Sequence, residues 1–339
     1  MTRKSPMFVA EISGNHLGSF ERAKKLIVQA AESGATAVKL QTYTPDTMTL
    51  NLKSFKVSDQ HNLWGGKSLY DLYSEAFTPW EWHAELFELI TKLGLIPFST
   101  PFDISAVEFL ESLNTPIYKI ASLESGDHGL IKAIAQTNKP IIASTGATNL
   151  EEIDELVDLV KTSGNNDLTL LVCTSAYPAM PKDANLLRLK FLNERYKLKV
   201  GLSDHTLGIG VSLAAIALGA TVIEKHFTLC RKDGGPDSAF SLEPQEFKLL
   251  VEEGFKAHSS LGSRDWNISK SEYESRSLRR SLYIVKNVKK GELITHDNLR
   301  AIRPGQGCAP KLLESLLGKY YTDDFSIGTP MSPKFAKKL

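Results

Sequence analysis

Short runs of β-branched and other apolar residues alternate with longer amphipathic stretches over residues 1–262. There are eight such runs, MFVAEI, AVKLQT, LIPFST, IYKIAS, IIASTG, LTLLVCTS, KVGLSDH and TVIEKHF. The stretches between them, such as FERAKKLIVQAAESG and LEEIDELVDLVKTSG, repeat apolar residues at helical spacing. Apolar strands separated by crossover helices indicate a parallel sheet buried on both faces, and eight units predict an α/β fold of the (β/α)8 TIM barrel type. An open doubly wound sheet is the alternative, although no GxGxxG follows the first strand.

Two parts of the chain depart from this repeat. Residues 43–78, between the second strand and its helix, are too long for an ordinary connection, and long insertions on barrel loops are usually functional. A polar stretch over 263–279 predicts a linker, and strand-like pieces with glycine turns, such as SLYIVKNVKKGELIT, AIRPGQG and FSIGTPM, predict a small domain over 280–339. Because a domain of this size has a marginal core, we expect it to dock on its own barrel or on a partner's.

Composition narrows the class of function. Forty basic residues against 39 acidic residues leave a formal charge of +1, which gives no general attraction to nucleic acid or to an anionic membrane. The three cysteines are far apart, so they form no zinc or redox motif, and this usage fits a reducing compartment. Because the chain has neither a signal-peptide pattern nor the roughly 20 apolar residues of a spanning helix, we expect a cytoplasmic protein.

The carboxyl ends of the predicted strands are unusually polar. In TIM barrels the active site lies at this end of the strands, so these residues are the candidates for its chemistry. They are Glu11, Lys39, Gln41, Ser99, Thr100, Lys119, Ser122, Ser144, Thr145, Thr174, Ser175, Tyr177, Ser203, Asp204, His205, Glu224 and His226.

His205 and His226 end two consecutive strands. Adjacent parallel strands lie about 4.8 Å apart, so the two imidazoles can share one divalent ion. With two protein ligands, water and substrate oxygens would complete the coordination, which suits a Lewis acid better than a structural ion. The alternative is that each histidine only donates a hydrogen bond to a neighbouring carboxylate.

Lys39 and Lys119 form a second group with the hydroxyls of Ser122, Ser144 and Ser203. Buried lysines are costly unless they are paired with an anion, so these residues predict a small ligand that carries phosphate or carboxylate. One alternative is that each lysine pairs internally with a glutamate at a neighbouring strand end. Another is that Lys119 is the Schiff-base nucleophile of a pyruvate lyase, since a desolvated lysine can be tuned for that role.

Glu11, Glu224 and Asp237, the last in GGPDS, are candidate acid and base groups, although a lone carboxylate more often stabilises the fold. The long insertion and the helix after it are rich in aromatic residues. These residues either form a wall on which a sugar stacks or belong to the core; they are Trp64, Tyr70, Tyr73, Trp80 and Trp82.

Taken together, the motifs resemble the sialic acid synthase family of bacterial nonulosonate synthases. The motifs are AEISGNHLGS, VKLQTY, FSTPF, YKIASLE, IASTGA, VCTSAYP, GLSDHTLG, IEKHFTL and GGPDSAFSL, and they run in order through the barrel. RRSLYIVKNVKKGELIT and RPGQG resemble the antifreeze-like SAF domain of the same enzymes, so the resemblance covers nearly the whole chain. Within the family, three segments look like the pseudaminic acid branch: QTYTPDTMTL, LWGGKSLYDLYSEAFTPWEWH and CTSAYP. The sialic acid branch instead has Asn at the position of Ser175.

The resemblance implies a transferase that condenses phosphoenolpyruvate with 2,4-diacetamido-2,4,6-trideoxy-L-altropyranose, giving pseudaminic acid and phosphate. C3 of phosphoenolpyruvate would attack the open-chain aldehyde, water would add at C2, and phosphate would leave through C–O cleavage. The alternative in the same family is synthesis of N-acetylneuraminate or legionaminate from an N-acetylmannosamine-type sugar. A third class, a sugar-binding or ice-binding scaffold without activity, would not need Glu11, Lys119, His205 and His226 together.

The resemblance also implies residue roles. His205 and His226 match ligands of a divalent metal, with Mn²⁺ the usual ion and Mg²⁺ or Co²⁺ the alternatives. Glu11 matches the catalytic carboxylate, Asp237 matches a sugar-contacting acid, and we assign Glu224 to catalysis as well. Arg303 matches a residue that the SAF domain of one subunit inserts over the partner's active site, which implies a domain-swapped homodimer. The phosphoenolpyruvate-binding residues are matched by Lys39, Thr100, Lys119, Ser122, Ser144 and Ser203, and Gln41 and Tyr177 are further candidates for substrate binding.

Overall fold

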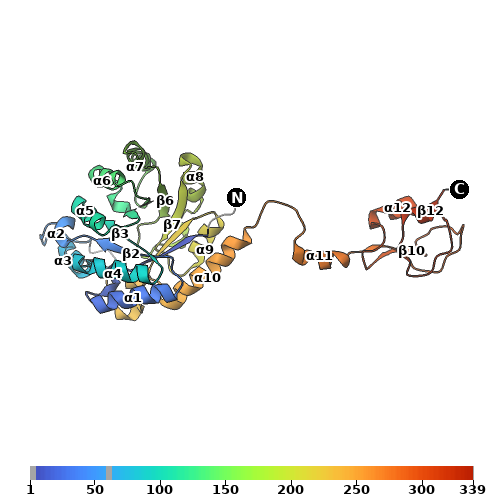
Figure 1. Cartoon of the computed structure of the whole chain (residues 1–339), viewed down its shortest axis with the longest axis horizontal. Coiled ribbons are helices and arrows are strands. Elements are labelled where there is room, and N and C mark those ends of the chain that lie inside the picture. Colours follow the sequence, from blue (N-terminus) through green and yellow to red (C-terminus); the bar gives the residue numbers. More distant parts are fainter. Residues whose placement is uncertain (1–4, 59–62, 339) are drawn as a thin grey trace. The chain divides into compact units, whose positions relative to one another are not determined.

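The computed structural model describes residues 5–58 and 63–338, and the chain divides into two compact units, Met1–Gly262 and Ser263–Leu339. In the first unit eight parallel strands close into a barrel in sequence order, and β1 pairs with β8 (Figure 1). This closure confirms the predicted TIM barrel and rules out the open sheet. The strands are β1 (Met7–Glu11), β2 (Ala37–Thr42), β3 (Ile96–Pro101), β4 (Tyr118–Ile120), β5 (Ile141–Ser144), β6 (Leu168–Cys173), β7 (Lys199–Asp204) and β8 (Val222–His226).

Helices follow the strands and surround the barrel (Figure 1). Several begin at a capping side chain: Ser19 accepts a hydrogen bond from the backbone N–H of Arg22, and Asn149 forms a capping box with Glu152. The helices are α1 (Phe20–Glu32), α2 (Pro45–Met48), α3 (Leu69–Ala76), α4 (Trp80–Lys92), α5 (Ile104–Ser112), α6 (His128–Gln136), α7 (Leu150–Thr162), α8 (Leu187–Tyr196), α9 (Gly210–Ala217) and α10 (Pro244–Ser260). Within the ranges described above, no helix is long and apolar enough to cross a membrane.

The two-residue period of the strands separates two layers of the barrel interior. Val9, Ala37, Phe98, Ile117, Ile142, Leu171 and Val222 form an apolar cluster inside the barrel. Two residues further along the same strands the inward positions become polar or ionisable, as in Ala37 to Lys39, Ile117 to Lys119 and Val222 to Glu224. The apolar layer therefore seals the barrel below, and the polar layer above it faces the carboxyl edge of the sheet.

The long insertion after β2 contains α2 and α3, and four of its residues, 59–62, lie outside the described residues. Helix α3 packs on the short 3₁₀ helix η1 (Ser13–His16) that follows β1. The helix thereby brings the insertion over the side of the barrel where β1 and β2 end.

The second unit has its own small core of Leu282, Ile284, Val288, Ile294, Leu299, Leu316, Tyr321 and Met331. Strands β9 (Ser281–Ile284) and β10 (Leu299–Ile302) pair antiparallel, as do β11 (Tyr320–Tyr321) and β12 (Ala336–Lys337). The unit also contains α12 (Leu313–Leu316), and α11 (Lys270–Ser277) lies within the stretch predicted as a linker. The prediction of a strand in FSIGTPM is wrong, because this segment makes only isolated bridges through Phe325 and Pro330.

Candidate active site

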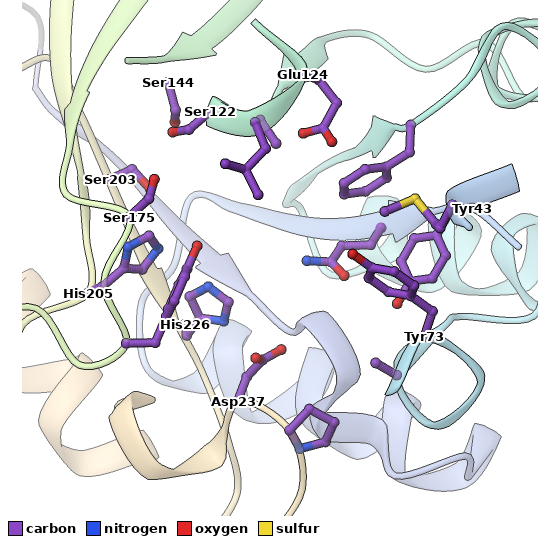
Figure 2. Close-up of a pocket in the computed structure, with 18 of the residues that line it drawn as sticks. Tyr43, Tyr73, Ser122, Glu124, Ser144, Ser175, Ser203, His205, His226 and Asp237 are labelled. Atoms are coloured by element: carbon purple, nitrogen blue, oxygen red, sulfur yellow. The ribbon is translucent and has the colours of Figure 1, made fainter. Parts of the chain in front are cut away.

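A cavity of about 470 Å³ opens at the carboxyl ends of the barrel strands (Figure 2). Of the predicted site residues, its lining includes Lys39, Gln41, Lys119, Ser122, Ser144, Tyr177, Ser203, His205, Glu224, His226 and Asp237. Glu11 and Thr100 lie just behind this lining, in contact with Lys39. Arg303 belongs to the second unit, so its role stays a prediction.

Lys39 is held within the protein. Its Nζ lies 2.6 Å from Glu11 Oε2 and 3.5 Å from Glu224 Oε1, and it donates a hydrogen bond of 3.1 Å to Thr100 Oγ1. Burial opposes the charge of Lys39, but the two carboxylates raise its pKa above the ordinary value. Burial, offset only in part by Lys39, raises the pKa of Glu11 to about 7. Internal pairing, one of the two alternatives for the lysines, therefore holds for Lys39.

Lys119 differs from Lys39 in its partners. Its side chain is buried, and Nζ donates to Ser144 Oγ at 2.7 Å and to the carbonyl oxygen of Ile120 at 2.9 Å. No carboxylate of the described residues forms an ion pair with Lys119, and burial lowers its pKa. An ammonium group that faces a cavity beside hydroxyls, without a carboxylate partner, is suited to an anionic ligand.

The loop after β5 adds a backbone N–H group to the same wall, and Ser122 after β4 and Ser203 in β7 add hydroxyls. The N–H of Gly146 donates to Ser122 Oγ at 3.0 Å, and Ser203 Oγ donates to Glu224 Oε1 at 3.3 Å. A side chain on residue 146 would overlap its surroundings, because its Cβ would lie 2.3 Å from Ser175 Oγ and 2.8 Å from Ser122 Oγ. Glycine at this position therefore lets the backbone approach the hydroxyls that line the cavity.

The rings of His205 and His226 lie side by side, with centroids 5.3 Å apart (Figure 2). His205 Nδ1 donates to the carbonyl oxygen of Thr174 at 2.9 Å, which leaves Nε2 as a free electron pair. His226 Nδ1 is buried and has no hydrogen-bond partner among the described residues. Burial, reinforced by the nearby His205 and Lys39, holds the pKa of His226 well below its ordinary value.

These features fit a divalent cation held by one nitrogen of each imidazole, since an orphaned ring nitrogen and a tautomer fixed by a backbone carbonyl are what a metal ligand requires. Nowhere in the described part of the chain do three or more His, Cys, Asp or Glu side chains converge to hold a metal ion. The protein therefore offers two strong ligands, and the remaining coordination positions would fall to water or substrate oxygens.

The other half of the cavity is built mostly by the insertion after β2. Its wall is largely apolar and includes Met48, Val57, Leu69, Leu72 and Phe102. Of the aromatic residues predicted to meet a sugar, Trp64 and Tyr73 line the cavity. The others do not: Tyr70 donates to Asp46, Trp80 stacks on Phe109, and Trp82 packs near Phe20.

Glu124 lines the cavity and escaped the sequence analysis. It ends the 3₁₀ helix η2 (Ser122–Glu124) that follows β4, and Figure 2 shows its carboxylate beside the pocket. Its Oε2 is buried without a hydrogen-bond partner in the described structure, and burial raises its pKa. The sequence did contain a signal, because Glu124 is the last residue of the motif YKIASLE, two positions after Ser122. No role was assigned to it there, since a carboxylate in a turn usually points to solvent.

The chain is similar to known proteins over nearly its whole length. The chain is 45% identical to the pseudaminic acid synthase of Helicobacter pylori, over 96% of both chains. It is 39% identical to the N,N'-diacetyllegionaminic acid synthase of Campylobacter jejuni, over 95% of this chain and 97% of that protein. The crystal structure of the N-acetylneuraminic acid synthetase of Leptospira borgpetersenii superposes with a TM-score of 0.72 at 31% identity, covering 80% of this chain and 90% of that one.

Two family models match the two units. The SAF domain matches residues 279–335, as the motifs of the second unit predicted. The NeuB family model matches residues 26–265, which hold all the predicted barrel-site residues except Glu11. The family model and the relatives agree, and the chain belongs to the NeuB family.

Proposed function

We propose that the protein is a pseudaminic acid synthase, which joins phosphoenolpyruvate to 2,4-diacetamido-2,4,6-trideoxy-L-altropyranose and releases phosphate. The observation that carries this proposal is the ammonium group of Lys119, which has no carboxylate partner among the described residues and lines the same cavity as the imidazole pair. The identity of 45% to a pseudaminic acid synthase, against 39% to a legionaminic acid synthase, favours this sugar over the alternatives.

The anionic end of phosphoenolpyruvate would bind where the cations and hydroxyls gather. Lys119 supplies charge, and the hydroxyls of Ser122, Ser144 and Ser203 supply hydrogen bonds to phosphate or carboxylate oxygens. Lys39, neutralised by its two glutamates, contributes less net charge and would serve mainly to orient Glu11 and Glu224. These contacts would fix the orientation of phosphoenolpyruvate in the half of the cavity at the carboxyl ends of β4 to β7.

The acceptor sugar would occupy the half of the cavity under the insertion. A 6-deoxy sugar with two acetamido groups presents three methyl groups, and the apolar wall of Leu69, Leu72 and Phe102 can bury them. Its amide N–H and hydroxyl groups need acceptors, which Asp237 and Glu124 provide, since Oε2 of Glu124 has no partner among the described residues. Gln41 and Tyr177 are the further polar contacts that we propose here.

A divalent cation would be held by His205 and His226, and we propose Mn²⁺. Such an ion, when bound, supplies positive charge that polarises a carbonyl oxygen. The protein's own part is to keep the imidazole of His226 neutral through burial and to fix the His205 tautomer through the carbonyl oxygen of Thr174.

The reaction joins C3 of phosphoenolpyruvate to the aldehyde carbon of the open-chain sugar, and water then adds at C2. The oxygen between C2 and phosphorus leaves with the phosphate, so the ketone oxygen of the product comes from water. Addition of water requires a group that accepts a proton, and we propose Glu11, whose pKa of about 7 suits a proton acceptor near neutral pH. Exclusion of other water by the walls of the cavity would protect the cationic centre at C2.

We also propose that the chain forms a domain-swapped homodimer in which Arg303 acts over the partner's cavity. The SAF domain match over residues 279–335 supports this only through the family. Sedimentation analysis should give the mass of a dimer, and R303A should lower turnover while the dimer persists.

The decisive experiment incubates the protein with phosphoenolpyruvate, Mn²⁺ and each candidate sugar separately, and weighs the products. The altrose derivative should give a nine-carbon acid together with one equivalent of phosphate, whereas N-acetylmannosamine and the legionaminate precursor should give little. Phosphoenolpyruvate labelled with ¹⁸O between C2 and phosphorus should deliver its label to the phosphate. Preferred turnover of another sugar would overturn the assignment of the acceptor, and absence of any product would overturn the proposed function.

A further inference from the structure

We infer that Ser13 is a positioning residue for Asp237, and that the protein keeps a strained backbone at Ser13 for this purpose. The inference rests on the proposed function, since it takes the acceptor sugar as the ligand of Asp237. Ser13 is the first residue of η1, two positions after Glu11 at the end of β1.

The backbone of Ser13 has a φ of +44°, in the left-handed region that side chains with a Cβ rarely adopt. Other non-glycine residues with positive φ include Asn114 and Asn138, which are exposed asparagines in turns, where this conformation is tolerated best. Ser13, in contrast, is buried. A strained, buried serine at the mouth of a barrel requires a compensating interaction, and strain of this kind clusters at functional sites.

The compensating interaction is a hydrogen bond from the Ser13 hydroxyl to Oδ2 of Asp237. The backbone N–H of Gly14 donates to the same carboxylate. Glycine at position 13 would adopt this backbone without strain, but it would have no hydroxyl to donate. The sequence thus has, where glycine would be favoured, a residue whose side chain reaches Asp237.

The two donors fix the carboxylate while leaving it able to accept further hydrogen bonds. The main chain around Asp237 is held separately, because Trp64 Nε1 donates to the carbonyl oxygen of Pro236 at 2.8 Å and Ser241 Oγ donates to that of Asp237 at 2.7 Å. Figure 2 shows the Asp237 carboxylate directed into the cavity, below His226. Ser13 therefore sets the direction of the carboxylate toward the sugar half of the cavity, without contacting the sugar itself.

Two variants separate the hydroxyl from the backbone strain. S13A loses the hydroxyl and keeps the strain, whereas S13G loses both. We expect both variants to raise the KM for the acceptor sugar at least about tenfold, because one hydrogen bond to a charged group is lost. The KM for phosphoenolpyruvate should not change in either, and S13G should melt at a higher temperature than S13A. The matched control is K197G, which relieves positive φ at an exposed helix end and should leave both KM values unchanged.

The outcomes decide between the hydroxyl and the backbone. Equal increases of the sugar KM in S13A and S13G support the inference, and a wild-type sugar KM in S13G overturns it. A parallel increase of both KM values would also overturn it, because that pattern indicates general damage. If the wild-type protein converts none of the sugars, the proposed function has failed. The inference can then still be tested by comparing crystal structures of the wild type and S13A. In that case a displaced Asp237 carboxylate in S13A supports it, and an unmoved carboxylate overturns it.

Discussion

Two buried histidines, His16 and His83, make the barrel sensitive to acid. His16 Nδ1 accepts a hydrogen bond from the N–H of Gly18 at 3.1 Å, and its Nε2 lies 3.2 Å from Thr78 Oγ1. His83 Nδ1 donates to the carbonyl oxygen of Pro79 at 3.2 Å, and its Nε2 lies 2.9 Å from Thr42 Oγ1. Each ring is thus held as a neutral tautomer, and a second proton on His16 would face the N–H of Gly18.

Burial lowers the pKa of each ring from its ordinary 6.5 to about 4, and in His16 the nearby His83 adds to the effect. Between these values the unfolded chain binds more protons than the folded protein, so the free energy of unfolding falls as the pH falls from 6.5 to 4. At pH 5 each ring lowers it by about 2 kcal/mol, and the pair by about 4 kcal/mol. This is a large share of the roughly 5–15 kcal/mol that stabilise a typical domain.

The test measures urea unfolding by circular dichroism between pH 8 and pH 4.5, in the wild type and in H83Q. Glutamine retains an acceptor for Thr42 but cannot be protonated in this range. We expect the dependence of the unfolding free energy on pH to become shallower in H83Q by about one proton, or about 1.2 kcal/mol per pH unit near pH 5 to 6. The control is H128Q, which removes an exposed histidine of the same unit. In this variant the unfolding free energy should depend on pH as it does in the wild type. An H83Q curve parallel to the wild type would refute the reasoning.

Further predictions concern the cavity. K119M should lower turnover at least about a hundredfold and yet raise the melting temperature, because a buried lysine without a carboxylate partner costs stability. K39M should instead lower the free energy of unfolding by about 3–5 kcal/mol, since it leaves Glu11 without its cation, and the double variant K39M/E11Q should recover part of this loss. EDTA should abolish phosphate release, with Mn²⁺ restoring it, and H226A should prevent the restoration. Borohydride with pyruvate should add no mass to the protein, and a covalent adduct at Lys119 would favour the lyase alternative.

The barrel could be predicted from the sequence because its strands are buried on both faces and appear as continuous apolar runs. The same runs also indicated where the cavity lies. Side chains alternate between the two faces of a strand, so one or two residues at the end of each strand point into the barrel. Lys39, Lys119 and His226 therefore line one cavity although they are far apart in the chain. Position at the carboxyl ends of the strands was sufficient to predict that these side chains meet, although it did not separate inward residues such as Ser203 from neighbours such as Asp204, which pairs with Lys225.

Other features depend on contacts that no local pattern encodes. The sequence presents Lys39 and Lys119 as equivalent, and only the structure shows that one is paired by Glu11 and the other is left for a ligand. Glu124 resembles any carboxylate in a turn until its burial is known. The left-handed conformation of Ser13 could not be anticipated either, because glycine is the residue that normally signals it.

The pairing of β1 with β8 has a consequence for synthesis of the chain on the ribosome. While translation is under way, the N-terminal strands carry their lysines and glutamates without the neighbours that later surround them. Only when β8 has left the ribosome can the two ends of the sheet join. An interrupted polypeptide that stops before β8 would expose charged groups that the complete barrel buries, and it should be a preferred substrate for cellular proteases.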